Sequence, residues 1–192
     1  MTLISYLYGR LTGFGVLVAL VTAVGDQATK LWILFTLEPR PNSVFSVSHL
    51  ADLALIKASD AKFPTRLHVG PFIDLVMTWN TGISYGLFPQ AGPLGQWALL
   101  AVKAVAVVLL WVWLAHATSR LTALALGLII GGAIGNAIDR GLHGAVADFV
   151  HFYITTWTFD WYVFNLADVG IVAGVIGLLY ESLLAKDAAK AP

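Results

Sequence analysis

Four long apolar runs, separated by more polar connections, dominate this chain of 192 residues. The runs cover residues 11–37, 94–115, 121–138 and 163–184, and each is close to the roughly 20 residues that an α-helix needs to cross a bilayer. Helices are favoured there because they satisfy their own backbone hydrogen bonds in lipid. The pattern therefore predicts an all-α membrane protein, in which residues 1–192 form one integral membrane domain with four transmembrane helices.

The two long connections carry different signals. Within the connection 38–92, residues 72–79 are β-branched and apolar and run into Asn80-Thr81-Gly82, which predicts short strands and a turn. The connection 140–162 is expected to be an aromatic loop, because residues 149–164 include eight aromatic side chains. Both connections would follow odd-numbered spans, so they lie on one side of the membrane.

The distribution of cations sets the expected orientation. Lys and Arg residues are similar in number on the two sides, but three of those in the connection 38–92 lie far from any span end, where they have little influence. When these three are discounted, the sequence favours cytoplasmic termini. The connections 38–92 and 140–162 are then extracytoplasmic.

The composition supports a membrane protein. Hydrophobic residues make up 58% of the chain and charged residues only 11%, whereas a typical soluble domain has about 25% charged residues. The formal net charge is zero, so no basic surplus suggests a nucleic-acid partner. The chain has no cysteine, which excludes disulfides, a thiol nucleophile and a thiolate metal site.

Charged side chains within apolar runs are costly, so each needs a partner or a function. Asp26 and Lys30 are four residues apart, lie on one face of the first predicted helix and can form an ion pair. Asp139 is followed directly by Arg140, and a neighbouring cation favours the ionised carboxylate. We expect both pairs to be mainly structural.

Three glycines in the third run are spaced by four residues, at Gly127, Gly131 and Gly135. This spacing places them on one face of a helix, where small residues let neighbouring backbones approach closely in a membrane. The third helix is therefore expected to pack tightly against its neighbours.

Two further acids, Asp148 and Asp168, point to catalysis. Asp148 lies among apolar residues after the third span, and Asp168 lies near the start of the fourth, so antiparallel spans would bring both to one membrane face. Two adjacent carboxylates in a medium of low dielectric share a proton, and the pair can activate water and polarise a carbonyl. The same spacing fits non-catalytic roles equally well. In these, Asp148 is an acid in an interfacial loop, and Asp168 is an acid in the first turn of a helix, where the helix dipole favours it. Asp160 is a rival partner.

Five short motifs follow one another along the chain. They are Asp26-Gln-Ala-Thr-Lys30, Asn80-Thr-Gly82, Gly131-Gly-Ala-Ile-Gly-Asn136-Ala-Ile-Asp139-Arg140, Val146-Ala-Asp148-Phe and Phe164-Asn165-Leu-Ala-Asp168. In this order and combination they resemble signal peptidase II, the lipoprotein signal peptidase of bacteria. The resemblance extends over all four predicted spans.

The resemblance implies an aspartic endopeptidase of the bacterial inner membrane, with its site near the outer face. It would cleave prolipoproteins on the N-terminal side of the diacylglyceryl-modified cysteine, without a metal or another cofactor. By the family's motifs the catalytic acids are Asp148 and Asp168. The residues expected to line or brace the site are Asp26, Lys30, Asn80, Gly82, Asn136, Asp139, Arg140 and Asn165.

The same resemblance implies a small extracytoplasmic β-cradle at about residues 71–88. The expected partners are prolipoprotein substrates and membrane lipids, with no nucleic acid, and the chain is expected to act as a monomer. A different class of function stays open: a small ion-coupled transporter could use Asp26, Lys30, Asp139 and Asp168 as a proton relay.

Overall fold

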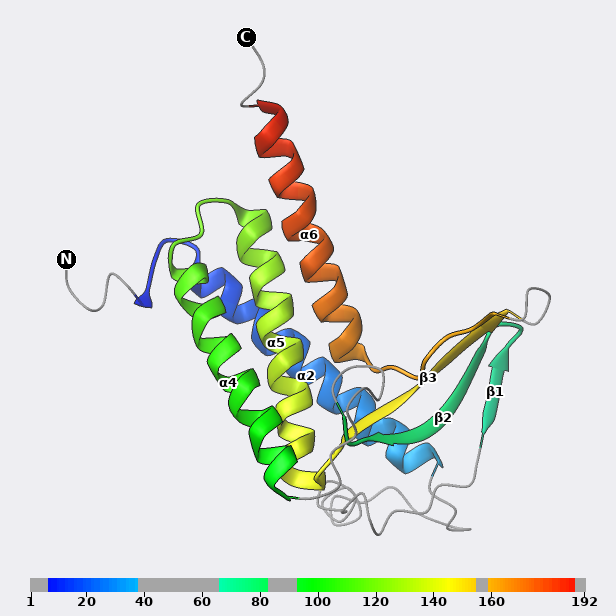
Figure 1. Cartoon of the computed structure of the whole chain (residues 1–192). Coiled ribbons are helices and arrows are strands. Elements are labelled where there is room, and N and C mark those ends of the chain that lie inside the picture. Colours follow the sequence, from blue (N-terminus) through cyan, green and yellow to red (C-terminus); the bar gives the residue numbers. More distant parts are fainter. Residues whose placement is uncertain (1–6, 38–65, 83–92, 155–158, 189–192) are drawn as a thin grey trace. The chain divides into compact units, whose positions relative to one another are not determined.

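The structure is a computed structural model that describes residues 7–37, 66–82, 93–154 and 159–188 (Figure 1). Its elements, in chain order, are α2 (Thr12–Leu37), β1 (Leu67–Gly70), β2 (Ile73–Asn80), α4 (Pro93–Ala115), α5 (Arg120–His143), β3 (Val146–Ile154), β4 (Phe159–Asp160) and α6 (Leu166–Ala188). The chain divides into two compact units. The helical unit comprises Met1–Gly25, Val102–Gly135 and Leu166–Pro192, and the sheet unit comprises Asp26–Ala101 and Asn136–Asn165.

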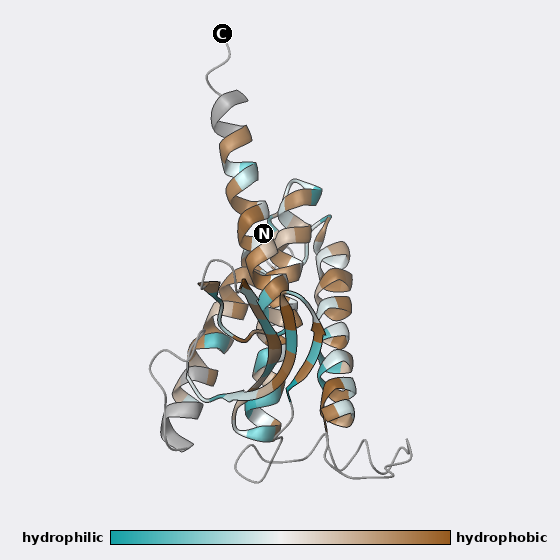
Figure 2. Cartoon of the chain, turned by 90° about the vertical axis from the view of Figure 1, so that its right-hand side faces the viewer, coloured by the Kyte–Doolittle hydropathy of each residue, from teal (hydrophilic) through white to brown (hydrophobic). Residues whose placement is uncertain are grey.

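Three helices in the described part of the chain are long and apolar enough to cross a membrane: Thr12–Leu37, Arg120–His143 and Leu166–Leu184. Within α4, a shorter apolar stretch covers Leu100–Ala115. Figure 2 shows that the helices are coloured mainly as hydrophobic. The mostly helical fold is thus confirmed, with three helices of membrane-spanning length, and the crossing of all four helices stays a prediction.

Helix α5 extends beyond the third predicted span. The apolar run ends at Ile138, but α5 continues through Asp139 and Arg140 to His143. The helix can continue because these three polar side chains are all buried within the protein. An apolar run therefore marks only the part of a helix that suits lipid. The helix itself can extend further, where its polar side chains are buried within the protein.

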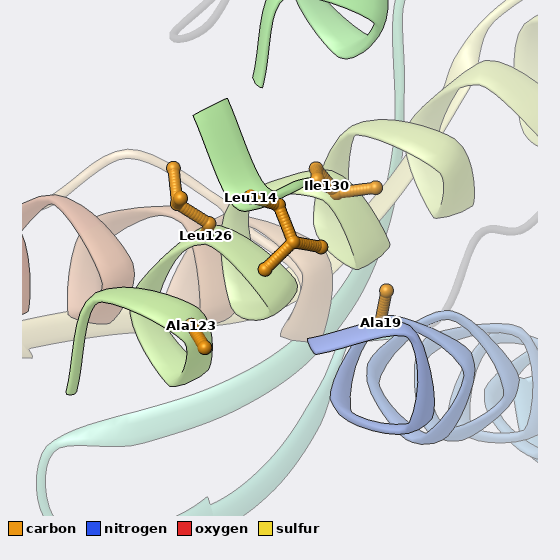
Figure 3. Packing of buried hydrophobic residues seen from close by; sticks show 5 residues of the cluster. All are labelled: Ala19, Leu114, Ala123, Leu126 and Ile130. Atoms are coloured by element: carbon orange, nitrogen blue, oxygen red, sulfur yellow. The ribbon is translucent and has the colours of Figure 1, made fainter. Parts of the chain in front are cut away.

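The helical unit is held together by close backbone approaches and by a small apolar core. The core residues are Ala19, Leu114, Ala123, Leu126 and Ile130 (Figure 3). A Cβ atom on Gly127 would lie 2.6 Å from the carbonyl oxygen of Gly15, and one on Gly131 would collide with the backbone of Ala19. Close packing at these two glycines is therefore confirmed, with α2 as the neighbour.

The sheet unit contains a four-stranded antiparallel sheet in the order β1-β2-β3-β4. One part of it packs on the end of α2, where Ile33, Leu37 and Phe149 form a buried cluster. The strand predicted at residues 72–79 is confirmed as β2. The small sheet matches the expected β-structure, and residues 83–88 of the expected cradle lie outside the described residues.

The aromatic connection is more regular than the sequence suggested. We expected residues 140–162 to be a loop, but β3 and β4 lie within this range. The segment Val146–Ile154 is rich in β-branched and aromatic residues, which favour a strand because such side chains fit the pleated surface of a sheet. The aromatic content had been interpreted as a sign of the membrane interface, which hid this strand signal.

Candidate active site

The sheet unit holds every predicted site residue except Asp168. These residues come from the second half of α2, the last residue of β2 and the turn after it, the end of α5, the start of β3 and the residue before α6. Eight of them form what we call the inner polar cluster: Asp26, Lys30, Asn80, Asn136, Asp139, Arg140, Asp148 and Asn165. All are buried except Asn80, which is half-buried.

Lys30 is the cation at the centre of the inner polar cluster. Its Nζ lies 2.7 Å from Oδ2 of Asp26 and 2.8 Å from Oδ2 of Asp139, and it donates to Oδ1 of Asn136 at 3.1 Å. The pair predicted between Asp26 and Lys30 is confirmed. Because the three charged side chains are at most 3% exposed, their ionic interactions are hardly screened by water.

Asp139 links the cluster to the strand that carries Asp148. One carboxylate oxygen accepts from Nε2 of Gln27 at 2.7 Å, and the other accepts from the backbone N–H of Ala147 at 3.0 Å. The sequence had suggested its neighbour Arg140 as the ion-pair partner, and this was wrong: within the described residues the paired cation is Lys30. A residue one position along a helix points in another direction, so sequence adjacency was a poor guide.

Arg140 instead fastens the turn after β2. Its guanidinium donates to the carbonyl oxygen of Gly82, and the N–H of Gly82 donates to Oδ1 of Asn80 at 3.0 Å. An Asn side chain that accepts from the backbone two residues later stabilises a tight turn. The motif Asn80-Thr81-Gly82 is therefore a turn that Arg140 holds in place from α5.

Two amide side chains hold the Asp148 carboxylate, one on each oxygen. Nδ2 of Asn165 donates to Oδ1 at 2.6 Å, and Nδ2 of Asn80 donates to Oδ2 at 3.1 Å. The same nitrogen of Asn165 lies 3.3 Å from the carbonyl oxygen of Ala147 and 3.1 Å from Oδ1 of Asn136. Neutral donors fix the orientation of a carboxylate without adding a charge.

Asp168 lies in the first turn of α6, three residues after Asn165, and is partly buried. An acid in the first turn interacts favourably with the helix dipole. Asp168 belongs to the helical unit whereas Asp148 belongs to the sheet unit, so their juxtaposition stays a prediction.

The sequence interpretation missed a second set of interacting polar residues, on the sheet. We call it the sheet-face cluster, and its members are Arg66, His68, Asp74, His151, Tyr153 and Asp160. His151 and Tyr153, which are two residues apart on β3, were a signal for it, because residues at every second position share one face of a strand. The loop assignment for 140–162 concealed that spacing.

Comparison with known proteins adds independent information. A family model described as signal peptidase (SPase) II matches residues 18–184. A lipoprotein signal peptidase of Nitrobacter hamburgensis is 51% identical over 180 residues, which cover 93% of this chain and 96% of that protein. One of Rhodopseudomonas palustris is 48% identical with the same coverage.

Two solved structures share the fold. Both are described as bacterial membrane enzymes, and their TM-scores to this chain are 0.69 and 0.65. Their identities are 23% and 24%, with 96% and 92% of this chain covered and 95% and 97% of theirs. At this low identity the likeness concerns the fold alone.

Proposed function

Because this chain belongs to the signal peptidase II family, we propose that it is an aspartic endopeptidase that removes the signal peptide of a bacterial prolipoprotein. The cut falls on the N-terminal side of the diacylglyceryl-modified cysteine. The observation that carries the aspartic mechanism is the held carboxylate of Asp148. A buried acid with an amide donor on each oxygen is fixed in one orientation. A catalytic group must be held in this way if it is to meet the substrate in the reactive geometry.

The second catalytic acid of the proposal is Asp168. Three residues of extended chain span at most about 11 Å, so covalent geometry keeps Asp168 close to Asn165, whose side chain binds Asp148. This connection supports a carboxylate pair in which one group is protonated and the other ionised, because two adjacent charges of the same sign repel each other.

The proposed reaction needs only water and the two acids. The ionised carboxylate takes a proton from water, and the water oxygen forms a bond to the carbonyl carbon of the scissile peptide. The protonated carboxyl donates to the carbonyl oxygen as negative charge develops there. The intermediate then collapses, the C–N bond breaks, and the leaving nitrogen receives the proton that the first carboxylate had taken.

The rest of the inner polar cluster positions Asp148. Asp139 binds the N–H of Ala147, the residue before Asp148, and Lys30 holds Asp139 against α2. Asn80, which Gly82 and Arg140 keep in its turn, reaches Asp148 from the other strand. In this proposal Lys30 and Arg140 act through other residues and do not touch the substrate.

The membrane setting of the proposal follows from the substrate. A diacylglyceryl group stays in lipid while its peptide must reach the carboxylates, so the site belongs at a water–lipid boundary. Phe159 and Trp161 are exposed and stack with ring centroids 5.6 Å apart, as suits such a boundary. We place the site at the outer face of the inner membrane, with four spans, cytoplasmic termini and a monomeric chain.

An ion-coupled transporter would need acids that exchange protons during transport. Two of the acids suggested for such a relay, Asp26 and Asp139, share one ammonium group and are buried with it. Asp139 also holds the backbone of β3. These contacts favour a structural role for both acids, and so they favour the peptidase over the transporter.

One experiment tests the reaction. Purified full-length protein in detergent is incubated with a synthetic lipidated precursor peptide, and the products are analysed by mass spectrometry. We expect two fragments whose masses place the cut immediately before the modified cysteine. A cut elsewhere would contradict the proposed specificity, and an intact precursor would contradict the peptidase itself.

A further inference from the structure

The sheet-face cluster lies on one face of the sheet because of strand register. His68 pairs with Asp74, and Asp74 pairs with His151, so these three form one row across β1, β2 and β3. Tyr153, two residues beyond His151, pairs with Asp160 on β4. Side chains two residues apart on a strand share a face. None of these residues belongs to the inner polar cluster.

Asp74 is the anchor of the sheet-face cluster. It is buried. Its carboxylate accepts a hydrogen bond from Nδ1 of His68 at 2.7 Å and one from the hydroxyl of Tyr153 at 3.3 Å, and it forms an ion pair with Nε of Arg66 at 3.3 Å. Burial acts to raise the pKa of Asp74, but these hydrogen bonds and the Arg66 charge outweigh it and hold the pKa below the usual 3.8. Asp74 is therefore ionised and already paired, so it holds its neighbours in place.

His151 lies between a cation and an anion. Its Nδ1 accepts from Nη2 of Arg66 at 3.4 Å, and its Nε2 donates to Oδ1 of Asp160. These contacts place a ring proton on Nε2, because a proton on Nδ1 would face the guanidinium. The ring also stacks on Tyr153, with centroids 5.4 Å apart and an interplanar angle of 28°. The imidazole thus fixes the separation between the two charged groups.

The charged groups flank an open cavity of about 360 Å³, whose lining also includes Ile154 and Phe159. Both poles are accessible: the side chain of Arg66 is 62% exposed, and that of Asp160 is 73% exposed. A simple anion would be attracted by Arg66 and repelled by Asp160, and a simple cation would meet the opposite problem. A zwitterion carries both charges a few atoms apart, so its anionic group can bind Arg66 while its cationic group binds Asp160.

We propose that this cavity binds the phosphoethanolamine headgroup of a membrane phospholipid. The phosphate would accept from Arg66, the primary ammonium would donate to Asp160, and Ile154 and Phe159 would contact the start of the lipid's apolar part. A carboxylate can accept hydrogen bonds from a primary ammonium, whereas a choline headgroup has no N–H to donate. Phe159 is exposed and stacks on exposed Trp161, so apolar aromatic surface continues beside the cavity.

Native mass spectrometry of the full-length protein in detergent tests this proposal without reference to proteolysis. The protein is titrated with short-chain phosphatidylethanolamine, phosphatidylglycerol and phosphatidylcholine of the same acyl length. We expect phosphatidylethanolamine to bind roughly tenfold more tightly than the other two lipids. Neither phosphatidylglycerol nor phosphatidylcholine has a charged N–H group that can donate a hydrogen bond to Asp160. Equal binding of the three lipids would overturn the proposal.

Single substitutions assign the two poles. Asp160→Asn should weaken phosphatidylethanolamine binding by roughly tenfold and leave phosphatidylglycerol binding unchanged or tighter, and Asp160→Glu should restore the preference. Arg66→Gln should weaken the binding of both lipids. The matched control Arg120→Gln, at an exposed arginine of the helical unit, should leave the binding of both unchanged. A preference that survives Asp160→Asn contradicts the proposal. Since Asp160 is 73% exposed, its substitution leaves the fold intact.

Discussion

The inner polar cluster and the sheet-face cluster use similar residues, but their cations differ in how far they are exposed to solvent. Both belong to the sheet unit, and β3 contributes to both, with Asp148 to the first and His151 to the second. In the inner cluster Lys30 is 3% exposed, whereas Arg66 and Asp160 of the sheet-face cluster are mostly exposed. The difference is therefore one of solvent access more than of chemistry.

Solvent access decides what each cluster can do. Buried charges lose their hydration, so each must be matched within the protein, and removal of one partner leaves the others unpaired. Such a cluster fixes positions, as a catalytic acid requires. Exposed charges are screened and keep some of their hydration, so they contribute little to stability and remain available to a ligand.

The largest effect on stability is expected at Lys30. Lys30→Met removes the ammonium that Asp26 and Asp139 share, and loss of one partner of a buried ion pair costs about 3–5 kcal/mol. Chemical unfolding in detergent should therefore show a large loss of stability. The control Arg120→Met, at an exposed cation, should change stability little. Similar midpoints for the two variants would show that Lys30 is not the centre of the cluster.

The next effect concerns the two amides that hold Asp148. Asn165→Ala removes the 2.6 Å hydrogen bond and Asn80→Ala the 3.1 Å one, and a lost bond to a charged group costs about 1.5–3 kcal/mol. We expect kcat on a lipidated precursor to fall by roughly 10- to 100-fold, more for Asn165→Ala than for Asn80→Ala. Unchanged kcat in both variants would mean that these amides do not position the catalytic acid.

A smaller and pH-dependent effect is expected at Asp74. Because the pKa of Asp74 is lower in the folded protein, its contribution to stability is complete above the unfolded value near 3.8 and is lost as the pH falls through the lower folded value. Asp74→Asn should remove this acid-dependent loss. Hydrogen exchange of β1 and β2 peptides between pH 6 and 3 measures it, and the same pH response in both proteins would contradict a lowered pKa of Asp74.

The smallest effect on stability is expected at Arg66. Its side chain is 62% exposed, and an exposed ion pair contributes at most about 1 kcal/mol. Thermal unfolding of Arg66→Gln should therefore resemble that of the original protein. A loss as large as that of Lys30→Met would mean that the two clusters do not differ in the way proposed here.

The sequence predicted the parts of the molecule that depend on local pattern. The apolar runs located the helices, the glycine spacing located the close contacts of α5 at Gly127 and Gly131, and the four-residue spacing of Asp26 and Lys30 gave their ion pair. These features follow from the period of a helix, which a sequence displays directly.

The sequence did not predict features that depend on partners distant along the chain. Nothing near Asp139 indicates that Lys30, rather than Arg140, is its cation. The sheet-face cluster joins Arg66 and His68 to His151 and Asp160 through strand register, and a register is not visible until the strands are paired. The aromatic residues of β3 were also ambiguous, because the membrane interface and a strand both favour them.

The central claim is that Asp148 and Asp168 together activate water. Its most direct test is the cleavage rate of a lipidated precursor by Asp148→Asn and Asp168→Asn, each shown by unfolding to be folded in detergent. The control is Asp187→Asn, an acid near the other end of α6. We predict that each of the first two variants loses at least about a thousandfold in kcat, because an amide can neither accept the proton of water nor donate as an acid, and that Asp187→Asn stays active. Substantial cleavage by either Asp148→Asn or Asp168→Asn would contradict the claim.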